Sequence, residues 1–246
     1  MWKWAGLLWA GVALGICAHA DAIDPAKLRH DLSGSVVALR QPLRGAEVVF
    51  RSDGEPEPPL VRGTFARDGL LRIDDVRLDG ARLQFSCHRV ILIARASGKG
   101  MEFFPTPEKT RLFVNLASRE ETSAQHALDS VFRTSKDTAA VLSNYARAFS
   151  QDGVLDGERR VTRCKLQPIA RPAPYGPANG RLVARVIINE RGEPEAIGVL
   201  NAPKSKSDEK IFLETLWEWR FVPYQNHGMP IACVATIAIR FEPHLR

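Results

Sequence analysis

Ser207 and Lys210 have the Ser-x-x-Lys spacing of a serine nucleophile and its base, and they are the first candidates for catalysis. A lysine three residues after a serine can accept the serine's proton and activate its hydroxyl as a nucleophile. The chain carries neither the Ser-Asp-Asn nor the Lys-Thr-Gly sequence downstream that would complete such a site. Asp208 and Glu209 follow Ser207 directly, and negative charges favour the first turn of a helix. We therefore expect Ser207 to cap a helix rather than to attack a substrate.

Other polar groups could hold a phosphate or a metal ion, but their spacing argues against it. Ala96–Gly100 (ASGKG) has the end of a phosphate-binding loop, yet Ile93 stands where the loop needs its first glycine. Asp74 and Asp75 are adjacent, and adjacent residues of a strand point to opposite faces. The histidines show no metal-binding spacing: His30, His88, His126, His227 and His244. We expect no metal, no cofactor and no enzymatic activity.

Two further groups of side chains leave alternatives open. Trp217, Trp219 and Phe221 could form a platform for a stacked ligand, although a core wedge between a helix and a sheet is the simpler expectation. Arginine is dense between residues 61 and 95, which is typical of a solvated face. Attraction to anionic lipid headgroups or lipopolysaccharide is the alternative for these arginines.

The composition of the chain is that of an ordinary globular protein. It has 246 residues, 45% hydrophobic and 25% charged, and its mean hydropathy is −0.17. These values exclude a disordered chain and a polytopic membrane protein, and the length suits one or two domains with their own cores. The net charge of +6 would permit binding to nucleic acid, but the export signal described next leads us to expect none.

The first 22 residues predict a secretory signal peptide. Lys3 is followed by about 13 apolar residues and by two small-x-small sites, Ala18–Ala20 and Ala20–Ala22. An uncleaved anchor helix would need about 17–25 apolar residues, and a lipoprotein would need a small residue before Cys17. We therefore expect cleavage of residues 1–22 and a periplasmic protein without an integral membrane span. Anchoring in the inner membrane, facing the periplasm, is the alternative.

Three cysteines remain after removal of the signal: Cys87, Cys164 and Cys233. An odd number in a compartment that permits disulfides allows one pair plus a free thiol, or three separate thiols. Cys87 and Cys233 both lie in strand-like alternation, which favours buried thiols at these two positions. No Cys-x-x-Cys spacing occurs, so a zinc or thioredoxin-like site is not predicted.

Residues 24–150 predict a β-rich domain, of the small barrel or sandwich type, with a helical appendix. Short runs of alternating or β-branched residues are expected to be strands: Ser35–Arg40, Ala46–Arg51, Gly69–Leu78, Ala81–Ala94 and Arg111–Ala117. Helical spacing then predicts one helix around Ala127–Phe132 and a second, capped by Ser135, around Ala140–Ala148. Residues 151–180 are polar and then proline-rich, which predicts a linker.

Residues 181–246 predict a second domain with the order strand, strand, helix, strand, so the whole chain is expected to be α+β. The first two strands alternate around a Glu-Arg-Gly turn and form a hairpin. The helix ends before Pro223, and a turn at Asn226–Gly228 leads into a long alternating strand. The expected strands and helix are Arg181–Asn189, Ala196–Asn201, the segment from Ser207 to Trp219, and Pro230–Phe241.

From about residue 168 to 246 the sequence resembles the C-terminal domain of the TonB family. The resemblance rests on the strand-Gly-strand unit and on a set of positions with a structural role at the helix end and the following turn: Trp219, Arg220, Phe221, Pro223, Gly228 and Pro230. Upstream, Val36–Arg40, Arg82–Ile93 and Ala127–Phe132 resemble, more weakly, N-terminal regions that precede this domain in some exported bacterial proteins.

The resemblance implies a protein partner. Members of the family bridge the inner membrane to outer-membrane transporters, and their C-terminal domain adds an extended transporter segment to a sheet edge. Carried over to this chain, the edge strand is Ile231–Arg240, and its exposed face consists of Ala232, Val234, Thr236, Ala238 and Arg240. The family's Tyr-Pro element before the first strand is matched by Pro174 and Tyr175, followed by Gly176 in place of proline.

Two departures from the family separate binding from force transmission. The family's energy transducers keep a transmembrane helix, whereas this chain is expected to lose its only apolar segment with the signal peptide. They also carry a long proline-rich rod of many tens of residues, whereas residues 151–180 would reach only about 90 Å at full stretch. We therefore expect an exported TonB-like protein that recognises an outer-membrane transporter segment by strand addition, linked to transport across the envelope. The alternative is a soluble periplasmic binding or assembly protein that forms a homodimer through the same edge strand.

Overall fold

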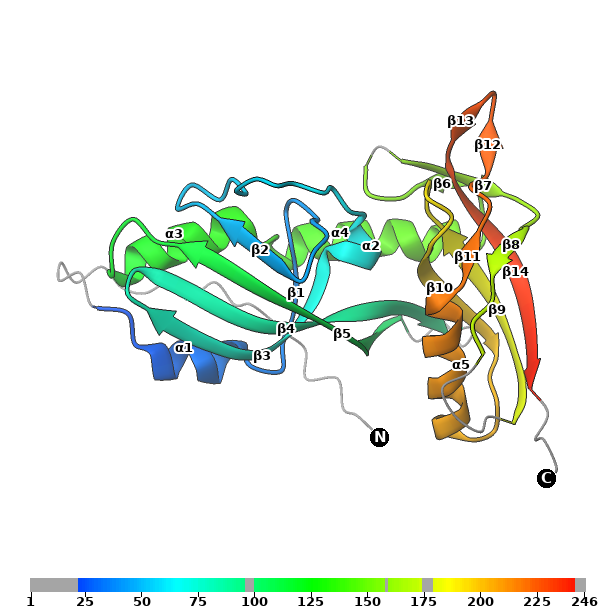
Figure 1. The fold of residues 1–246 in the computed structure, drawn as a ribbon, viewed down its shortest axis with the longest axis horizontal. Helices are drawn as coiled ribbons and strands as arrows, with labels where there is room; N and C mark the ends of the chain where they lie inside the picture. The colour runs from blue at the N-terminus through cyan, green and yellow to red at the C-terminus, as the bar shows by residue number, and fades with distance from the viewer. Residues whose placement is uncertain (1–21, 96–99, 158, 174–178, 242–246) are drawn as a thin grey trace. The chain divides into compact units, whose positions relative to one another are not determined.

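The computed structural model describes residues 22–95, 100–157, 159–173 and 179–241, and these form a mixed α+β fold (Figure 1). The helices of the described residues are α1 (Pro25–Leu32), α2 (Phe65–Asp68), α3 (Glu121–Val131), α4 (Ser135–Ala148) and α5 (Lys206–Glu218). The strands are β1 (Val36–Ala38), β2 (Glu47–Phe50), β3 (Leu70–Asp79), β4 (Arg82–Arg95), β5 (Met101–Asn115), β6 (Gly153–Val154), β7 (Arg160–Arg163), β8 (Pro168–Ala170), β9 (Gly180–Ile188), β10 (Pro194–Asn201), β11 (Arg220–Phe221), β12 (Gln225–Asn226), β13 (Met229–Pro230) and β14 (Ala232–Phe241). Across these described ranges, no helix combines the length and the apolar character needed to cross a membrane.

The chain divides into two units, and three elements have residues in both of them: β4, β5 and α4. Unit 1 contains the residues up to Arg89 together with Pro107–Ala139, and unit 2 contains Val90–Thr106 together with Ala140–Arg246. The expected domain boundary near residue 150 therefore differs from the observed division. The reason is the length of β4, whose residues Leu92–Arg95 pair in parallel with β10, far away in the sequence.

Unit 1 is built on an open sheet with the strand order β1, β3, β4, β5, β2. The first pairs in this order are antiparallel, whereas β2 pairs with β5 in parallel. The barrel that the sequence suggested for this region is wrong, because β1 and β2 end the sheet within the described residues instead of pairing with each other. A chain with strands this unequal in length, from the three residues of β1 to the fifteen of β5, cannot close evenly.

The helices of unit 1 cover the sheet through residues at helical spacing. Ala124, Ala127, Leu128 and Val131 of α3 are buried in the same core as the apolar residues of β3 and β4. Helix α4 begins at Ser135 itself, one residue earlier than a cap at Ser135 would require. Its cap is Thr134, whose hydroxyl accepts a hydrogen bond from the Asp137 N–H at 3.1 Å. Helix α1, which the sequence analysis did not predict, is capped by Asp24.

Unit 2 has a sheet with the order β4, β10, β9, β14, β7, β6, and α5 packs on one of its faces (Figure 1). The β9–β10 hairpin and the antiparallel pairing of β14 with β9 follow the expected alternation. Helix α5 buries Phe212, Leu213, Leu216 and Trp217 against this face. Its N-cap is Ser205, which accepts from the Asp208 N–H, so the predicted cap at Ser207 is two residues too late.

The opposite face of the unit 2 sheet receives the C-terminal half of α4. Tyr145 is fully buried there, and Phe149 packs directly over Gly198 of β10. A side-chain carbon on Gly198 would meet the Phe149 ring at 2.8 Å, so only glycine lets the helix end approach the strand this closely. Unit 2 therefore has three layers, with helices on both faces of its sheet.

The expected linker, residues 151–180, contains the strands β6, β7 and β8. Strand β7 pairs in parallel with β14, β6 pairs with β7, and β8 pairs with β11. Their partners lie tens of residues away, so a local reading of polar and proline-rich composition could not reveal them.

Candidate protein-binding edge

The outer edge of β14 is the candidate functional site. On its inner side β14 pairs with β9 without interruption from Cys233 to Phe241. On its outer side β7 pairs with three residues, Ala232 to Val234. Beyond Val234, no strand within the described ranges pairs with the outer side of β14. The edge is therefore covered at its start and open along the rest of the strand.

One hydrogen bond shows to which side of β14 the main-chain N–H and C=O groups of each residue point. The Cys164 N–H donates to the Val234 carbonyl at 3.2 Å, so Val234 directs its main-chain groups outward. In an antiparallel strand these groups alternate between the two sides. Thr236 and Ala238 therefore direct their N–H and C=O groups to the outer edge, while Ala235 and Ile237 bond to β9.

The structure divides the predicted partner-binding face into two parts. Ala232 and Val234 were expected to be exposed, but both are 0% exposed. Both residues pair with β7 in the sheet. Their side chains lie on the face where Phe149 packs, because Arg163 and Arg185, which pair with Val234 and Thr236, both donate to the Phe149 carbonyl. The remaining predicted residues are exposed: Thr236, Ala238 and Arg240. Pro174 and Tyr175 lie outside the described residues.

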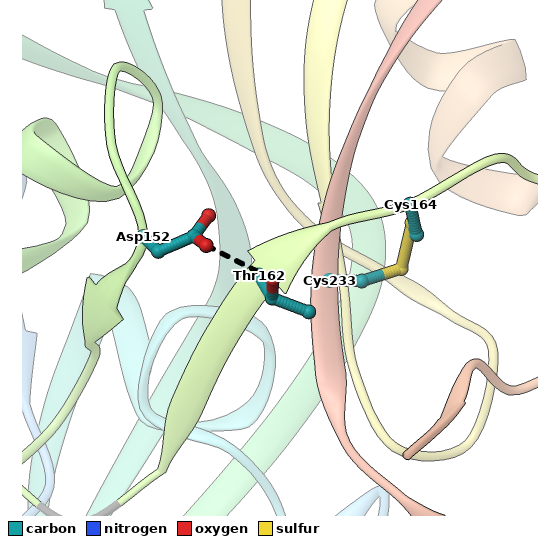
Figure 2. Close-up of a disulfide and its surroundings, with 4 residues drawn as sticks. All are labelled: Asp152, Thr162, Cys164 and Cys233. Atoms are coloured by element: carbon teal, nitrogen blue, oxygen red, sulfur yellow. Dashed lines mark hydrogen bonds between the residues drawn. A yellow bond between two sulfur atoms is a disulfide. The ribbon is translucent and has the colours of Figure 1, made fainter.

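A disulfide between Cys164 and Cys233 lies where the covered part of the edge ends (Figure 2). The expectation of a buried free thiol at Cys233 is therefore wrong, because β7 brings Cys164 beside it. Thr162 of β7 donates to the Asp152 carboxylate at 3.0 Å, which holds the same strand at its other side (Figure 2). The disulfide covalently joins the end of β7 to β14, and the open edge begins at this crosslink.

The Trp219-Arg220-Phe221 sequence ends α5 and ties it to the β9–β10 hairpin. The Arg220 guanidinium donates to the carbonyls of Trp217, Glu218 and Trp219, which have no partner within the helix. Trp219 and Phe221 lie in the core on the α5 face, with their rings 6.1 Å apart. The core-wedge expectation for these aromatic side chains therefore matches their position.

The residues after the helix direct the chain back into β14. Pro223 follows β11, and β12 and β13 pair around a turn at His227 and Gly228, both with positive φ. Pro230 pairs with Gln225, and the Ile231 N–H donates to the Tyr224 carbonyl at 2.9 Å. This ribbon sets the point at which β14 enters the sheet.

A buried ionic network, which the sequence analysis missed, supports the base of β7. Arg159 lies just before β7 and contacts three carboxylates and a phenol. Glu195 and Tyr145 are fully buried, and the Tyr145 hydroxyl donates to Glu195. Burial opposes the charge of Arg159, but the Glu195 carboxylate outweighs burial and raises the pKa of the guanidinium. Burial, and then Glu195, raises the pKa of Tyr145, which therefore remains protonated.

The residues considered for catalysis or metal binding have other neighbours. Ser207 contacts Ser205 at 2.6 Å, while the Lys210 amine lies 3.9 Å from Glu214. Asp74 contacts His88, whereas Asp75 contacts arginines of α1 and β3. Most of the Ala96–Gly100 loop lies outside the described residues. Across the described chain, no three His, Cys, Asp or Glu side chains are grouped to hold a metal ion.

Comparisons with known proteins do not assign a function to this edge. A scan against protein-family models found no match, and a search of curated proteins found none. What remains is a chemically specific surface: a strand with exposed main-chain donors and acceptors at Thr236 and Ala238, next to a covalent crosslink. Such an edge can pair with an extended chain.

Proposed function

We propose that this chain is an exported, TonB-like protein that recognises a segment of an outer-membrane transporter by strand addition. The segment pairs with the outer edge of β14, and this recognition is linked to transport across the envelope. No catalytic step is part of this proposal.

The open edge beyond Val234 is the observation that carries the proposal. Thr236 and Ala238 present outward main-chain groups, and β14 is held rigidly by nine registered pairs with β9. A pre-ordered edge lowers the entropic cost of adding a strand, because only the incoming segment must become ordered. β7 already pairs with the start of this edge, so the edge is competent to accept a strand.

The disulfide supports the exported location. Disulfides form and persist in oxidising compartments such as the periplasm and are rare in the cytosol. Ile23 is buried and Asp24 caps α1, so processing after Ala20 would keep every described residue of unit 1, and processing after Ala22 would remove only the bridge between Ala22 and Glu120. Cleavage further along the chain would remove residues that the fold uses.

A second candidate function is self-association through the same edge. An unpaired strand can pair with its counterpart in another copy, because each offers the donors and acceptors that the other needs. In an antiparallel arrangement centred on Ala238, Thr236 of one copy would face Arg240 of the other. This arrangement places no like charges directly opposite each other.

A proline at the edge tests strand addition. Thr236→Pro removes an outward N–H that β9 does not use, and proline is tolerated at a solvent-facing edge position. We expect the wild type to bind synthetic peptides covering the periplasmic N-terminal segments of TonB-dependent transporters. The proline variant should bind about tenfold more weakly or not at all. Isothermal titration calorimetry would measure both affinities.

The control for this experiment is Thr236→Val, which keeps the N–H and the β-branched shape. It should bind like the wild type, and circular dichroism should show that all three proteins are folded. Equal binding by Thr236→Pro and the wild type would refute strand addition at this edge. Sedimentation at several concentrations would reveal the second candidate, since a homodimer should weaken with the same proline substitution.

A further inference from the structure

One face of the β3–β4 hairpin in unit 1 carries polar side chains that point away from the core. Ile73 of β3 and Phe85 and Cys87 of β4 are buried in the core to which α1 and α3 also contribute. Successive residues of a strand alternate between the two faces, so the residues next to these point outward. Four half-buried polar side chains follow from this alternation: Arg72, Gln84, Ser86 and His88.

A bulge in the hairpin brings a carboxylate to His88. The register of β3 and β4 shifts between Ile73 and Asp75, so Asp74 has no partner residue on β4. Bulges often turn a side chain toward a functional position. The Asp74 carboxylate hydrogen-bonds Nδ1 of His88, and because an ionised carboxylate can only accept, Nδ1 carries the proton. The Nε2 atom lies on the other side of the ring, and no hydrogen bond joins it to another described residue.

Arg72 is the direct cross-strand partner of His88. It is half-buried, yet its guanidinium forms no hydrogen bond, ion pair or ring contact with any residue that the structure describes. Direct partners have Cβ atoms about 5 Å apart, so the guanidinium and the imidazole can reach the same ligand group. Partial burial without a bonding partner costs free energy, and an anion at this point would supply the missing partner.

The neighbouring arginines differ from Arg72, because the protein itself engages them. Arg77 donates to Asp75 at 2.9 Å, and Arg82 donates to Asn115 at 2.7 Å. A membrane-binding surface needs a cluster of several available basic side chains, so a single available guanidinium favours one discrete anion. The other arginines between residues 61 and 95 that interact with groups of the protein are these: Arg62, Arg67, Arg77, Arg82, Arg89 and Arg95.

The carboxylates beside Arg72 and His88 leave room for such an anion. Asp74 occupies the Nδ1 side of the His88 ring, so an anion at Nε2 would lie away from it. Asp75, two residues along β3, lies 2.8 Å from Arg29 and 2.9 Å from Arg77. Two arginines therefore compensate its single negative charge.

Two neutral polar side chains continue this face from His88 along β4. Ser86 and Gln84 are half-buried, and neither side chain forms a hydrogen bond within the described chain. Alternate residues of a strand are about 7 Å apart, so these groups lie about 7 and 14 Å along β4 from His88. A hydroxyl and an amide can both donate to and accept from the hydroxyl groups of a ligand.

We propose that this face binds a small phosphate monoester of a hydroxyl-rich compound, such as a sugar phosphate. The three terminal oxygens of the phosphate match two N–H groups of the Arg72 guanidinium and the Nε2–H of the protonated His88 ring. A carboxylate offers two oxygens, which the guanidinium fork alone would occupy. Ser86 and Gln84 bond the hydroxyl groups of the ligand. This inference concerns unit 1 and is independent of strand addition at β14.

Three probes test the ligand chemistry on the whole mature chain: glucose 6-phosphate, inorganic phosphate and glucose. We expect glucose 6-phosphate to bind about tenfold more tightly than inorganic phosphate, because the neutral side chains add hydrogen bonds to the sugar. Glucose should not bind detectably, since it lacks the anion that Arg72 and His88 recognise. Isothermal titration calorimetry would measure the three affinities.

Two matched substitutions remove one positive charge each from the same face. Arg72→Gln should weaken the binding of glucose 6-phosphate about tenfold or more, because charge-assisted hydrogen bonds are lost. Arg82→Gln lies about 20 Å along β4 from His88 and should change the affinity by less than about twofold. Ser86→Ala should weaken glucose 6-phosphate about fivefold and leave inorganic phosphate unchanged. Circular dichroism would show that all variants are folded.

Each other outcome overturns the proposal. Absence of glucose 6-phosphate binding, or equal losses in Arg72→Gln and Arg82→Gln, would show that no discrete phosphate site exists on this face. Equal affinities for glucose 6-phosphate and inorganic phosphate would exclude a sugar ligand. Phosphatidylglycerol vesicles form the last arm: if they bind the wild type, and Arg72→Gln and Arg82→Gln weaken that binding equally, the face would be assigned to a membrane surface instead.

Discussion

At the scale of single residues, Cys87 shows how burial controls chemistry in unit 1. Its thiol lies in β4, is 2% exposed, and is the cysteine of the described chain outside the disulfide. Burial, with a smaller contribution from the Asp74 charge, raises the pKa of Cys87 to about 12, against the lowering effect of Arg89. The thiol therefore remains protonated and inert in the folded protein at neutral pH.

This raised pKa predicts a pH-dependent loss of stability. Between the ordinary value of 9.0 and the folded value of about 12, the folded state holds a proton that the unfolded chain releases. The contribution is fully present below pH 9 and is lost as the pH rises. Compared with Cys87→Ala, the wild type should lose about 1.4 kcal/mol more of its unfolding free energy by pH 10.

Urea denaturation of both proteins from pH 7 to pH 10 measures this difference, because lysines and tyrosines titrate equally in the two and cancel. A constant offset between the two stability curves would show that Cys87 does not titrate abnormally.

Other features of single residues could be predicted from the sequence only approximately or not at all. The caps at Thr134 and Ser205 lie one and two residues from the predicted serines, since several adjacent polar residues can each act as a cap. The Arg159 network could not be predicted, because its partners Tyr145 and Glu195 are distant in sequence and have no shared spacing. Alternation predicted Thr236, Ala238 and Arg240 as exposed, but it could not predict that β7 covers Val234.

At the scale of elements, the β9–β10 turn is fixed by a close approach to the end of α5. Gly192 has φ of +78°, and its carbonyl accepts from the Phe221 N–H at 2.8 Å. A side-chain carbon there would overlap the Phe221 carbonyl oxygen. The hairpin, the helix end and β11 are therefore joined at a point where glycine is required.

Gly192→Ala should destabilise the protein strongly, and Gly228→Ala provides a matched control. Gly228 also has a positive φ, of +80°, but an added carbon there meets nothing within 4 Å. The control should cost about 1 kcal/mol from backbone conformation alone, and Gly192→Ala about 3 kcal/mol, because overpacking adds to that cost. Thermal and urea denaturation would measure both, and equal losses would show that the contact with Phe221 has no energetic weight.

Element types were more predictable than their pairing. Strict alternation predicted β9 and β14, and helical spacing predicted α3, α4 and α5, because each pattern lies within one segment. The parallel pairs β2–β5, β4–β10 and β7–β14 were not predicted, since parallel partners need long connections and leave no local turn signal. For the same reason the division between units could not be located from composition.

At the scale of the whole molecule, the disulfide makes the stability of the folded protein depend on the compartment in which it folds. Cys164 and Cys233 are 69 residues apart in sequence, so their bond restricts a long loop of the unfolded chain. For a loop of this length the chain-entropy contribution is about 4 kcal/mol. A protein that folds in a reducing compartment would lack this contribution, and the end of β7 would be held to β14 by hydrogen bonds and packing.

The state of the cysteines in the cell therefore tests the exported location. In denaturant without reductant, the mature periplasmic protein should take one alkyl label, at Cys87, and three labels after reduction. An uncleaved chain keeps Cys17 and should take one label more in each case, and its mass should include the first 22 residues. Intact mass spectrometry of fractionated cells would count the labels and locate the N-terminus, which we expect at Asp21 or Ile23. Three labels on the mature protein before reduction would contradict the disulfide. They would also place the protein about 4 kcal/mol below the stability expected for the oxidised form.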